Sequence, residues 1–341
     1  MTEVLSYEVV QDWEQIPDGY VHRDVVGVTV DSRDRVYLIT RGDARVFVYD
    51  RDGSFITAWG EDVFTPQTHG ITAGPDDSIY AVDDGGHTVH KFTPEGEQLM
   101  VLGNPRVPSD TGYDPKIGVA SIKKGGAPFN RPTNLAVGLD GDLYVSDGYG
   151  NARIHCFSSQ GEHLHSWGEP GTGPGQFNVP HDVAVAPDGR LFVADRENDR
   201  IQIFSPEGEY LDEWPHVQRP TGIHIGSEGL VYVSSLWWRV GQTSQRLGPI
   251  RFDLPGHMSI LDLNGNLLLR WISADRCSPG NFCAPHDICA DSHGDIYVAE
   301  ASYSFAISKD LVSPDCHTLQ KFTPVPQNIS ARGRSSRHIV G

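Results

Sequence analysis

One short pattern recurs six times along the chain: an aliphatic residue, an aromatic residue, and then small or β-branched residues. The copies are Val36–Leu38, Ile79–Asp83, Leu143–Asp147, Leu191–Asp195, Val231–Ser234 and Ile296–Glu300. Such segments favour buried pleated strands. Each copy follows another apolar run and a turn and precedes a third run, and several units end in a tryptophan-bearing fourth run. Repeats of four short strands predict an all-β fold, a β-propeller with six blades.

The two ends of the chain complete this count. The sixth unit has a third run at Thr318–Phe322 but no fourth, whereas Ser6–Trp13 reads like a fourth strand that has no repeat of its own. We therefore expect this N-terminal strand to complete the last blade, because a closed ring leaves no open sheet edge. Residues 1–325 then form a single six-bladed propeller, and the polar, arginine-bearing residues 326–341 form a flexible tail.

Two insertions interrupt the repeat, near residues 104–131 and 236–258. Long loops in compact repeat proteins often carry function. Both insertions are expected near one rim of the ring, which favours a lid or a substrate wall over ordinary surface loops.

Charge and cysteine usage limit the partners and the compartment. The net charge of −18 argues against nucleic acid and anionic membranes as partners. We expect neither a signal peptide nor a membrane span. The odd count of five cysteines favours free thiols in a reducing compartment, and so a cytoplasmic protein. A Cys277–Cys283 disulfide is compatible with the spacing alone but is the less favoured interpretation.

Three histidines share one position in alternate units. His69, His181 and His286 each stand directly before the first apolar run of units two, four and six. In a six-bladed ring, alternate blades would direct three imidazoles at the central axis in a near-threefold array. Three neutral imidazoles with an open fourth position are the arrangement of a catalytic zinc site. A single histidine at a strand start would more often cap a turn, so the prediction depends on the shared phase.

The turn after each second strand should return to the same face. Arg41 and Arg196 occupy one register there, in units one and four, and Tyr149 lies one residue further along in unit three. Arginine binds a carboxylate bidentately, so both arginines are candidates for clamping an acidic substrate. A phenol beside a metal and arginines is a candidate general base. Ordinary ion pairs with Asp43, Asp195 or Glu197, and a hydrogen-bonded wall residue, are the alternatives.

At these residues the chain resembles the peptidyl-α-hydroxyglycine α-amidating lyases, the second catalytic unit of peptidylglycine α-amidating monooxygenase. The resemblance covers most of residues 20–324. It is carried by Arg41–Asp43, Asp147–Ile154, Trp167–Glu169, Gly175–His181, Val193–Gln202 and Pro285–Ile288. It implies a six-bladed propeller of NHL-type repeats with zinc on His69, His181 and His286. It also implies Tyr149 as the base and Arg41 and Arg196 at the substrate carboxylate and hydroxyl.

The same resemblance implies a structural calcium in the channel. Its ligands would be the Asp287 carboxylate and the main-chain carbonyls of Val28 and Ile71, which are oxygen ligands suited to a hard cation. The sequence also departs from the family pattern. Ala284 replaces a methionine, and Gly150, Phe192 and Ile203 stand where the family's disulfide cysteines are expected.

We therefore expect a zinc-dependent lyase. It would activate the hydroxyl of a small α-hydroxy acid, such as a peptidyl-α-hydroxyglycine or a ureidoglycolate-like carbinolamide, and cleave the adjacent C–N bond to release a glyoxylate-type product. Three alternatives are aldolase-type C–C cleavage on the same site, a propeller hydrolase such as a lactonase, and a non-catalytic NHL binding module. The expected partner is a small-molecule carboxylate.

Overall fold

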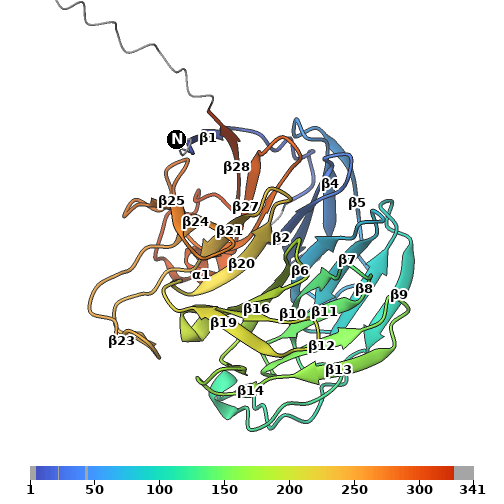
Figure 1. The fold of residues 1–341 in the computed structure, drawn as a ribbon. Helices are drawn as coiled ribbons and strands as arrows, with labels where there is room; N and C mark the ends of the chain where they lie inside the picture. Colours follow the sequence, from blue (N-terminus) through green and yellow to red (C-terminus); the bar gives the residue numbers. More distant parts are fainter. Residues whose placement is uncertain (1–4, 22, 43–44, 326–341) are drawn as a thin grey trace, which may run out of the picture.

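The computed structural model describes residues 5–21, 23–42 and 45–325 as six four-stranded antiparallel sheets. This confirms the predicted six-bladed β-propeller (Figure 1). Blades one to three consist of β2–β5 (Asp24–Val30, Val36–Arg41, Val46–Tyr49, Phe55–Trp59), β6–β9 (Thr68–Ala73, Ile79–Asp83, Thr88–Phe92, Gln98–Gly103) and β10–β13 (Pro132–Val137, Leu143–Asp147, Arg153–Phe157, His163–Trp167).

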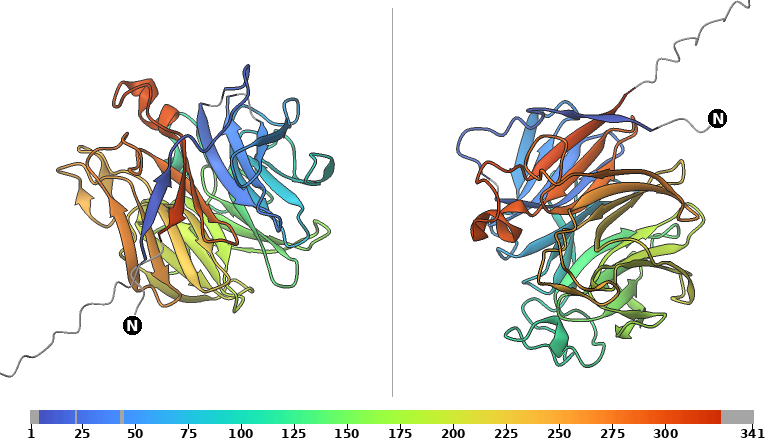
Figure 2. Two further views of the ribbon diagram at one scale, coloured as in Figure 1. Left: turned by 90° about the horizontal axis from the view of Figure 1, so that it is seen from above. Right: turned by 90° about the vertical axis from the view of Figure 1, so that its left-hand side faces the viewer.

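Blades four and five consist of β16–β19 (Pro180–Val185, Leu191–Asp195, Arg200–Phe204, Tyr210–Trp214) and of β20, β21, β24 and β25 (Pro220–Ile225, Leu230–Ser235, His257–Asp262, Leu267–Ile272). Blade six consists of β26–β28 (Pro285–Ala290, Ile296–Glu300, Leu319–Pro324) and β1 (Tyr7–Val10). The N-terminal strand therefore completes the last blade, as the sequence predicts. Figures 1 and 2 show β1, in blue, beside β28, in red.

Trp13 differs from its expected place. It follows β1 instead of ending the strand, and its ring packs between Tyr49 of blade one and Tyr297 of blade six. Its Nε1 donates a hydrogen bond to the Arg51 carbonyl at 2.9 Å. The N-terminal segment thus fastens the two blades that close the ring through a buried aromatic contact as well as through strand pairing.

The hydrophobic core lies between neighbouring blades. Tyr37 and Ile39 of blade one pack with Ile79 and Phe92 of blade two, and the other blades pack pairwise in the same way. The innermost strands contact each other in sequence around the ring and close it where β2 meets β26. This packing explains the repeated pattern, because a second strand has neighbouring blades on both faces and is apolar throughout.

Short elements fill the loops. The insertion at 104–131 contains a 3₁₀ turn, Val119–Ser121, and that at 236–258 contains the small hairpin of β22 (Thr243–Ser244) and β23 (Gly248–Pro249). Two further short strands, β14 (Glu169–Pro170) and β15 (Gln176–Phe177), precede blade four, and α1 (Ser302–Phe305) and two more 3₁₀ turns (Arg196–Asn198, Ile307–Lys309) follow second strands. No helix in the described ranges could cross a bilayer. The tail predicted at 326–341 lies outside the described residues.

One expectation from the sequence is wrong. Cys277 and Cys316 form a disulfide with a Cα–Cα distance of 4.8 Å, whereas Cys156, Cys283 and Cys289 are free and buried. Blade six folds back on itself and brings two loops together that are 39 residues apart in sequence, a pairing that local spacing does not reveal. The cysteine argument for a reducing compartment therefore no longer holds, and the cytoplasmic location is only a prediction.

Candidate metal centre and active site

The three predicted histidines meet at the centre of the ring. His69, His181 and His286 come from β6, β16 and β26, the innermost strands of blades two, four and six. Their ligand nitrogens all lie within 4.8 Å of one another, and each side chain is buried. They are the one group of this kind found in the described residues that could hold a metal ion.

A backbone irregularity places these side chains. The sequence predicts each histidine directly before its strand. Each is instead the second residue of the strand, at the point where the pairing with the next strand shifts register. The innermost strands of the other three blades shift at the same point. A bulge bends a strand and re-aims its side chain. The bulge therefore turns the histidines toward the axis, out of the alternation that the sequence pattern follows.

Main-chain carbonyls of the intervening blades fix the three rings. Nδ1 of His69 lies 2.6 Å from the Thr133 oxygen, and Nδ1 of His181 lies 2.6 Å from the Thr221 oxygen. Nδ1 of His286 lies 2.7 Å from the Val26 oxygen. A carbonyl only accepts hydrogen bonds, so each Nδ1 carries the proton and donates. This tautomer leaves every Nε2 with a free lone pair for a metal ion.

Burial keeps the imidazoles neutral. Desolvation holds the pKa of His69, His181 and His286 well below the ordinary value, and arginines, together with neighbouring imidazoles for His69 and His181, lower it further. The Nε2 atom of His286 is buried and has no hydrogen-bond partner among the described residues. A buried polar atom without a partner is costly, and a metal ion would satisfy it. Three neutral, pre-oriented nitrogens therefore fit a divalent transition metal.

Tyr149 lies against two of the three histidines. Its hydroxyl oxygen is 3.2 Å from Nε2 of His69 and 3.0 Å from Nε2 of His181. The loop that follows β11 carries this residue, and its backbone N–H donates to the Arg131 carbonyl at 3.3 Å. The predicted base therefore reaches the predicted metal site.

Arg196 approaches the same phenol from blade four. Its Nη1 donates to the Tyr149 hydroxyl at 2.9 Å and its Nε to Glu197 at 2.8 Å. Burial alone would lower the pKa of Arg196, but Tyr149 and Glu197 raise it overall, so the guanidinium stays charged. The ion pair with Glu197, one alternative for this arginine, thus coexists with contact to the site.

Arg41 borders the histidines from blade one. Its Nε donates to the carbonyl of Thr68, the residue before His69, at 3.2 Å. Its positive charge also helps to lower the pKa of all three imidazoles. Its alternative ion-pair partner Asp43 lies outside the described residues.

Sequence reasoning missed two further arginines. Arg131 holds Asp84 through Nε at 2.6 Å and Nη2 at 2.9 Å, and its guanidinium lies 5.5 Å from the centre of the Tyr149 ring. Arg219 pairs with Glu197, the partner of Arg196. Both precede a Pro-Thr pair in blades that lack the histidine. Comparing the repeats at the position two residues before the histidine would have revealed them.

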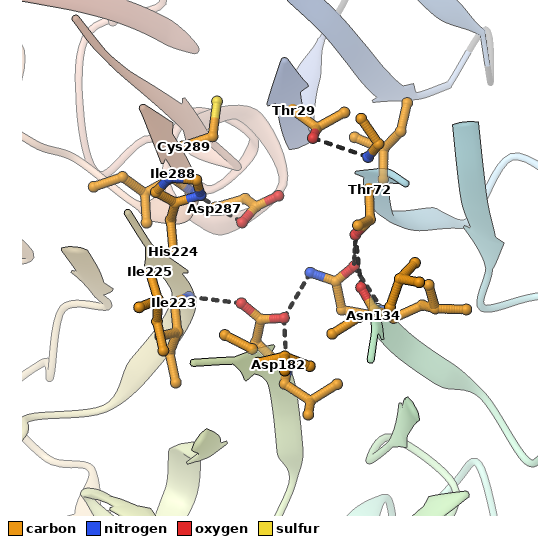
Figure 3. Close-up of a pocket in the computed structure, with 18 of the residues that line it drawn as sticks. Thr29, Thr72, Asn134, Asp182, Ile223, His224, Ile225, Asp287, Ile288 and Cys289 are labelled. Atoms are coloured by element: carbon orange, nitrogen blue, oxygen red, sulfur yellow. Dashed lines mark hydrogen bonds between the residues drawn. The ribbon is translucent and has the colours of Figure 1, made fainter. Parts of the chain in front are cut away.

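A cavity of about 440 Å³, here called the inner-strand cavity, lies along the innermost strands (Figure 3). Asp287, Val28 and Ile71, the residues expected to hold calcium, all line it. Asp287 accepts hydrogen bonds from the N–H groups of Val28 at 3.0 Å and Ile288 at 2.8 Å. Asp182 also lines the cavity, and none of the described lining residues is a lysine or arginine.

These two carboxylates are costly to ionise without a cation. Burial raises the pKa of Asp287 to about 7, and burial together with the charge of Asp287 raises that of Asp182 well above its ordinary value. Two buried carboxylates with no cationic side chain beside them fit a hard divalent ion, which would compensate both charges. Asp182 was not predicted from the sequence.

The comparisons with known proteins agree with this fold. An NHL repeat model matches residues 129–157, 177–204 and 282–309, in blades three, four and six. The virginiamycin B lyase from Staphylococcus aureus superposes with a TM-score of 0.56 at 15% identity, over 94% of this chain and all of that one. The chain is therefore a six-bladed β-propeller that contains NHL repeats.

Its relatives include amidating lyases. Peptidyl-alpha-hydroxyglycine alpha-amidating lyase 1 of Drosophila melanogaster is 30% identical over 299 residues, which are 80% of this chain and 50% of that protein. The human NHL repeat-containing protein 3 is 35% identical over 244 residues, 67% of this chain and 66% of that protein. The chain thus matches only about half to two thirds of these relatives. The resemblance to the amidating lyases is confirmed.

Proposed function

We propose that the protein is a metal-dependent lyase that cleaves a C–N bond beside the hydroxyl of a small α-hydroxy acid. The observation that carries the proposal is the cluster of three buried histidines whose ligand nitrogens lie within 4.8 Å of one another. The Tyr149 hydroxyl lies against two of them, and the Arg196 guanidinium donates to that hydroxyl. The relatives named as amidating lyases support this choice of reaction. Zinc is the proposed metal, because three histidines with an open position suit its catalytic sites.

The charge around the histidines favours an anionic substrate. Arg41, Arg131 and Arg196 lie beside the site, and Arg219 lies behind Arg196. Among the described residues Asp84 pairs with Arg131, while Glu197 is shared by Arg196 and Arg219. Arg41 has no ion pair within the described ranges. Arg41 and Arg196 thus place guanidinium groups beside the histidines, and a guanidinium can bind a small carboxylate bidentately.

The residues then have distinct roles. Arg41 and Arg196 bind and orient the substrate carboxylate and hydroxyl. A bound zinc ion supplies Lewis-acid activation of the substrate hydroxyl. Tyr149 takes the hydroxyl proton, and Arg196 Nη1, 2.9 Å away, stabilises negative charge on the phenol oxygen. The O–H electrons form the new C=O bond as the C–N bond breaks, and the proton passes to the departing nitrogen. The products are an amide and glyoxylate.

The test is glyoxylate release from an N-acyl-α-hydroxyglycine by zinc-replete protein. We expect turnover that a chelator abolishes and that Tyr149→Phe reduces by about 10²- to 10⁴-fold, the usual contribution of a general base. Ester or lactone hydrolysis without glyoxylate release would favour a propeller hydrolase. Release of an aldehyde by C–C cleavage would favour an aldolase. A protein without bound metal or turnover would favour a binding module.

We further propose that the inner-strand cavity holds calcium, with Asp287 and the carbonyls of Val28 and Ile71 as ligands. The uncompensated carboxylates of the cavity support this proposal. Added Ca²⁺ should raise the thermal midpoint of EGTA-treated protein, and Asp287→Asn should abolish most of the increase. An equal increase in both proteins would exclude this site.

A further inference from the structure

A continuous series of buried and partly buried contacts leads from the blade-five insertion to Tyr149. It begins at Trp238, whose Nε1 donates to Asp199 Oδ1 at 2.8 Å. The backbone N–H of Arg219 donates to the same oxygen, also at 2.8 Å. The Arg219 guanidinium lies 4.1 Å from the centre of the Trp238 ring. The insertion therefore contacts the Arg219 side chain directly and its backbone through Asp199.

Arg219 in turn fixes a single carboxylate. Its Nε and Nη2 lie 3.2 and 2.9 Å from Glu197 Oε1, and its Nη1 donates to the Trp237 carbonyl at 3.0 Å. Glu197 Oε1 also accepts the Nε–H of Arg196 at 2.8 Å. One Glu197 oxygen thus joins the guanidiniums of Arg219 and Arg196, and Arg196 donates to the Tyr149 hydroxyl.

The end of this series at the insertion is shielded from water, whereas the side chains of Arg196 and Glu197 are 11% and 16% exposed. Trp238 is 3% exposed and Arg219 is 8% exposed. Burial would raise the pKa of Glu197, but Arg196 and then Arg219 lower it overall, so the carboxylate stays ionised. Charged hydrogen bonds are strong when they are shielded, and removing one partner leaves the other charge uncompensated.

We propose that Glu197, Arg219 and Trp238 are positioning residues that hold Arg196 against Tyr149, and that the blade-five insertion locks this arrangement. This inference builds on the proposed function, in which Arg196 and Tyr149 act on the substrate. It also assigns the insertion a role other than the lid expected from the sequence, because Trp237 and Trp238 are both buried beneath the surface.

The first test needs no substrate. Protein labelled with ¹³C at the tyrosine ζ-carbon gives one signal per tyrosine, and the Tyr149 signal is assigned by its absence in Tyr149→Phe. We expect Glu197→Gln and Arg219→Ala to shift this signal and Arg219→Lys to shift it less. The matched control is Arg190→Ala, which removes an exposed ion pair with Asp188 in the same blade and should leave the signal unchanged.

An unchanged Tyr149 signal in folded Glu197→Gln and Arg219→Ala would overturn the proposal. If Arg219→Ala does not fold, Trp238→Phe decides, because it keeps an aromatic ring over Arg219 but loses the hydrogen bond to Asp199. A shift in Trp238→Phe supports the series from the insertion, and no shift contradicts it.

The second test is kinetic. Misplacing a reacting group by about 1 Å costs on the order of 10²-fold in rate, so we expect Glu197→Gln and Arg219→Ala to lower kcat by about 10- to 100-fold with bound zinc unchanged. Arg219→Lys should recover part of the loss, and a loss confined to KM would contradict a positioning role. If the wild type releases no glyoxylate, the proposed function fails, whereas the tyrosine signal still decides the positioning role.

Discussion

The Cys277–Cys316 disulfide gives a quantitative prediction. It closes a loop with a sequence separation of 39, which contains β26, β27, α1 and His286. The chain-entropy model assigns such a loop about 4 kcal/mol of stabilisation, because the crosslink restricts the unfolded chain. For a protein of this size, scaling from unfolding entropies gives a decrease of about 5 °C in the thermal midpoint when the bond is reduced.

Two assays measure this directly. Protein purified without reductant and unfolded in guanidinium should react with a thiol reagent at three cysteines, and at all five after reduction. Differential scanning calorimetry should show a lower thermal midpoint for the wild type with a phosphine reductant than without it. The Cys277→Ser/Cys316→Ser double variant is the control, since the reductant should not affect it. Five reactive thiols before reduction, or a wild-type midpoint that the reductant does not change, would refute the reasoning.

Three other perturbations test separate parts of the structure. Trp13→Ala should lower the free energy of unfolding by about 3–5 kcal/mol, because it removes the indole ring that packs between Tyr49 and Tyr297 and helps close the ring of blades. Denaturant titration measures this change, and a loss below about 1 kcal/mol would contradict the prediction. His317 lies 2.9 Å from the buried Glu300. Burial would lower the pKa of His317, but the Glu300 carboxylate raises it overall. The stabilisation from this pair is therefore present below the pKa of His317 in the unfolded chain and is lost as the pH rises through its pKa in the folded protein. The stability difference between wild type and His317→Asn should therefore shrink as pH rises from about 6 to 9, and a difference independent of pH would show that the pair is not ionised. Arg41→Ala should raise KM more than it lowers kcat if Arg41 only binds the substrate carboxylate, whereas a pure kcat loss would indicate a chemical role.

The fold could be predicted because its signal repeats. Each second strand is packed between neighbouring blades, so six segments such as Leu143–Asp147 and Leu191–Asp195 carry the same apolar pattern. The phase of the three histidines within these repeats then placed them in alternate blades. One repeat alone would not have distinguished a metal ligand from a turn cap.

Other features depend on contacts between segments far apart in sequence. The bulges that contain the histidines are invisible in a pattern with a period of two. The cysteine pair and the place of Trp13 arise only when blade six closes on itself and on blade one. Arg131 and Arg219 have their own register, but their relation to Tyr149 and Glu197 depends on loops that no repeat predicts.

Metal analysis of the purified protein tests the central claim most directly. The convergence of His69, His181 and His286 predicts about one zinc or other transition-metal ion per chain by elemental analysis after exhaustive dialysis. His181→Ala should lose most of this metal, while His293→Ala, which changes an exposed histidine outside the cluster, should retain it. A wild-type protein without transition metal after reconstitution, or equal metal in wild type and His181→Ala, would contradict the account.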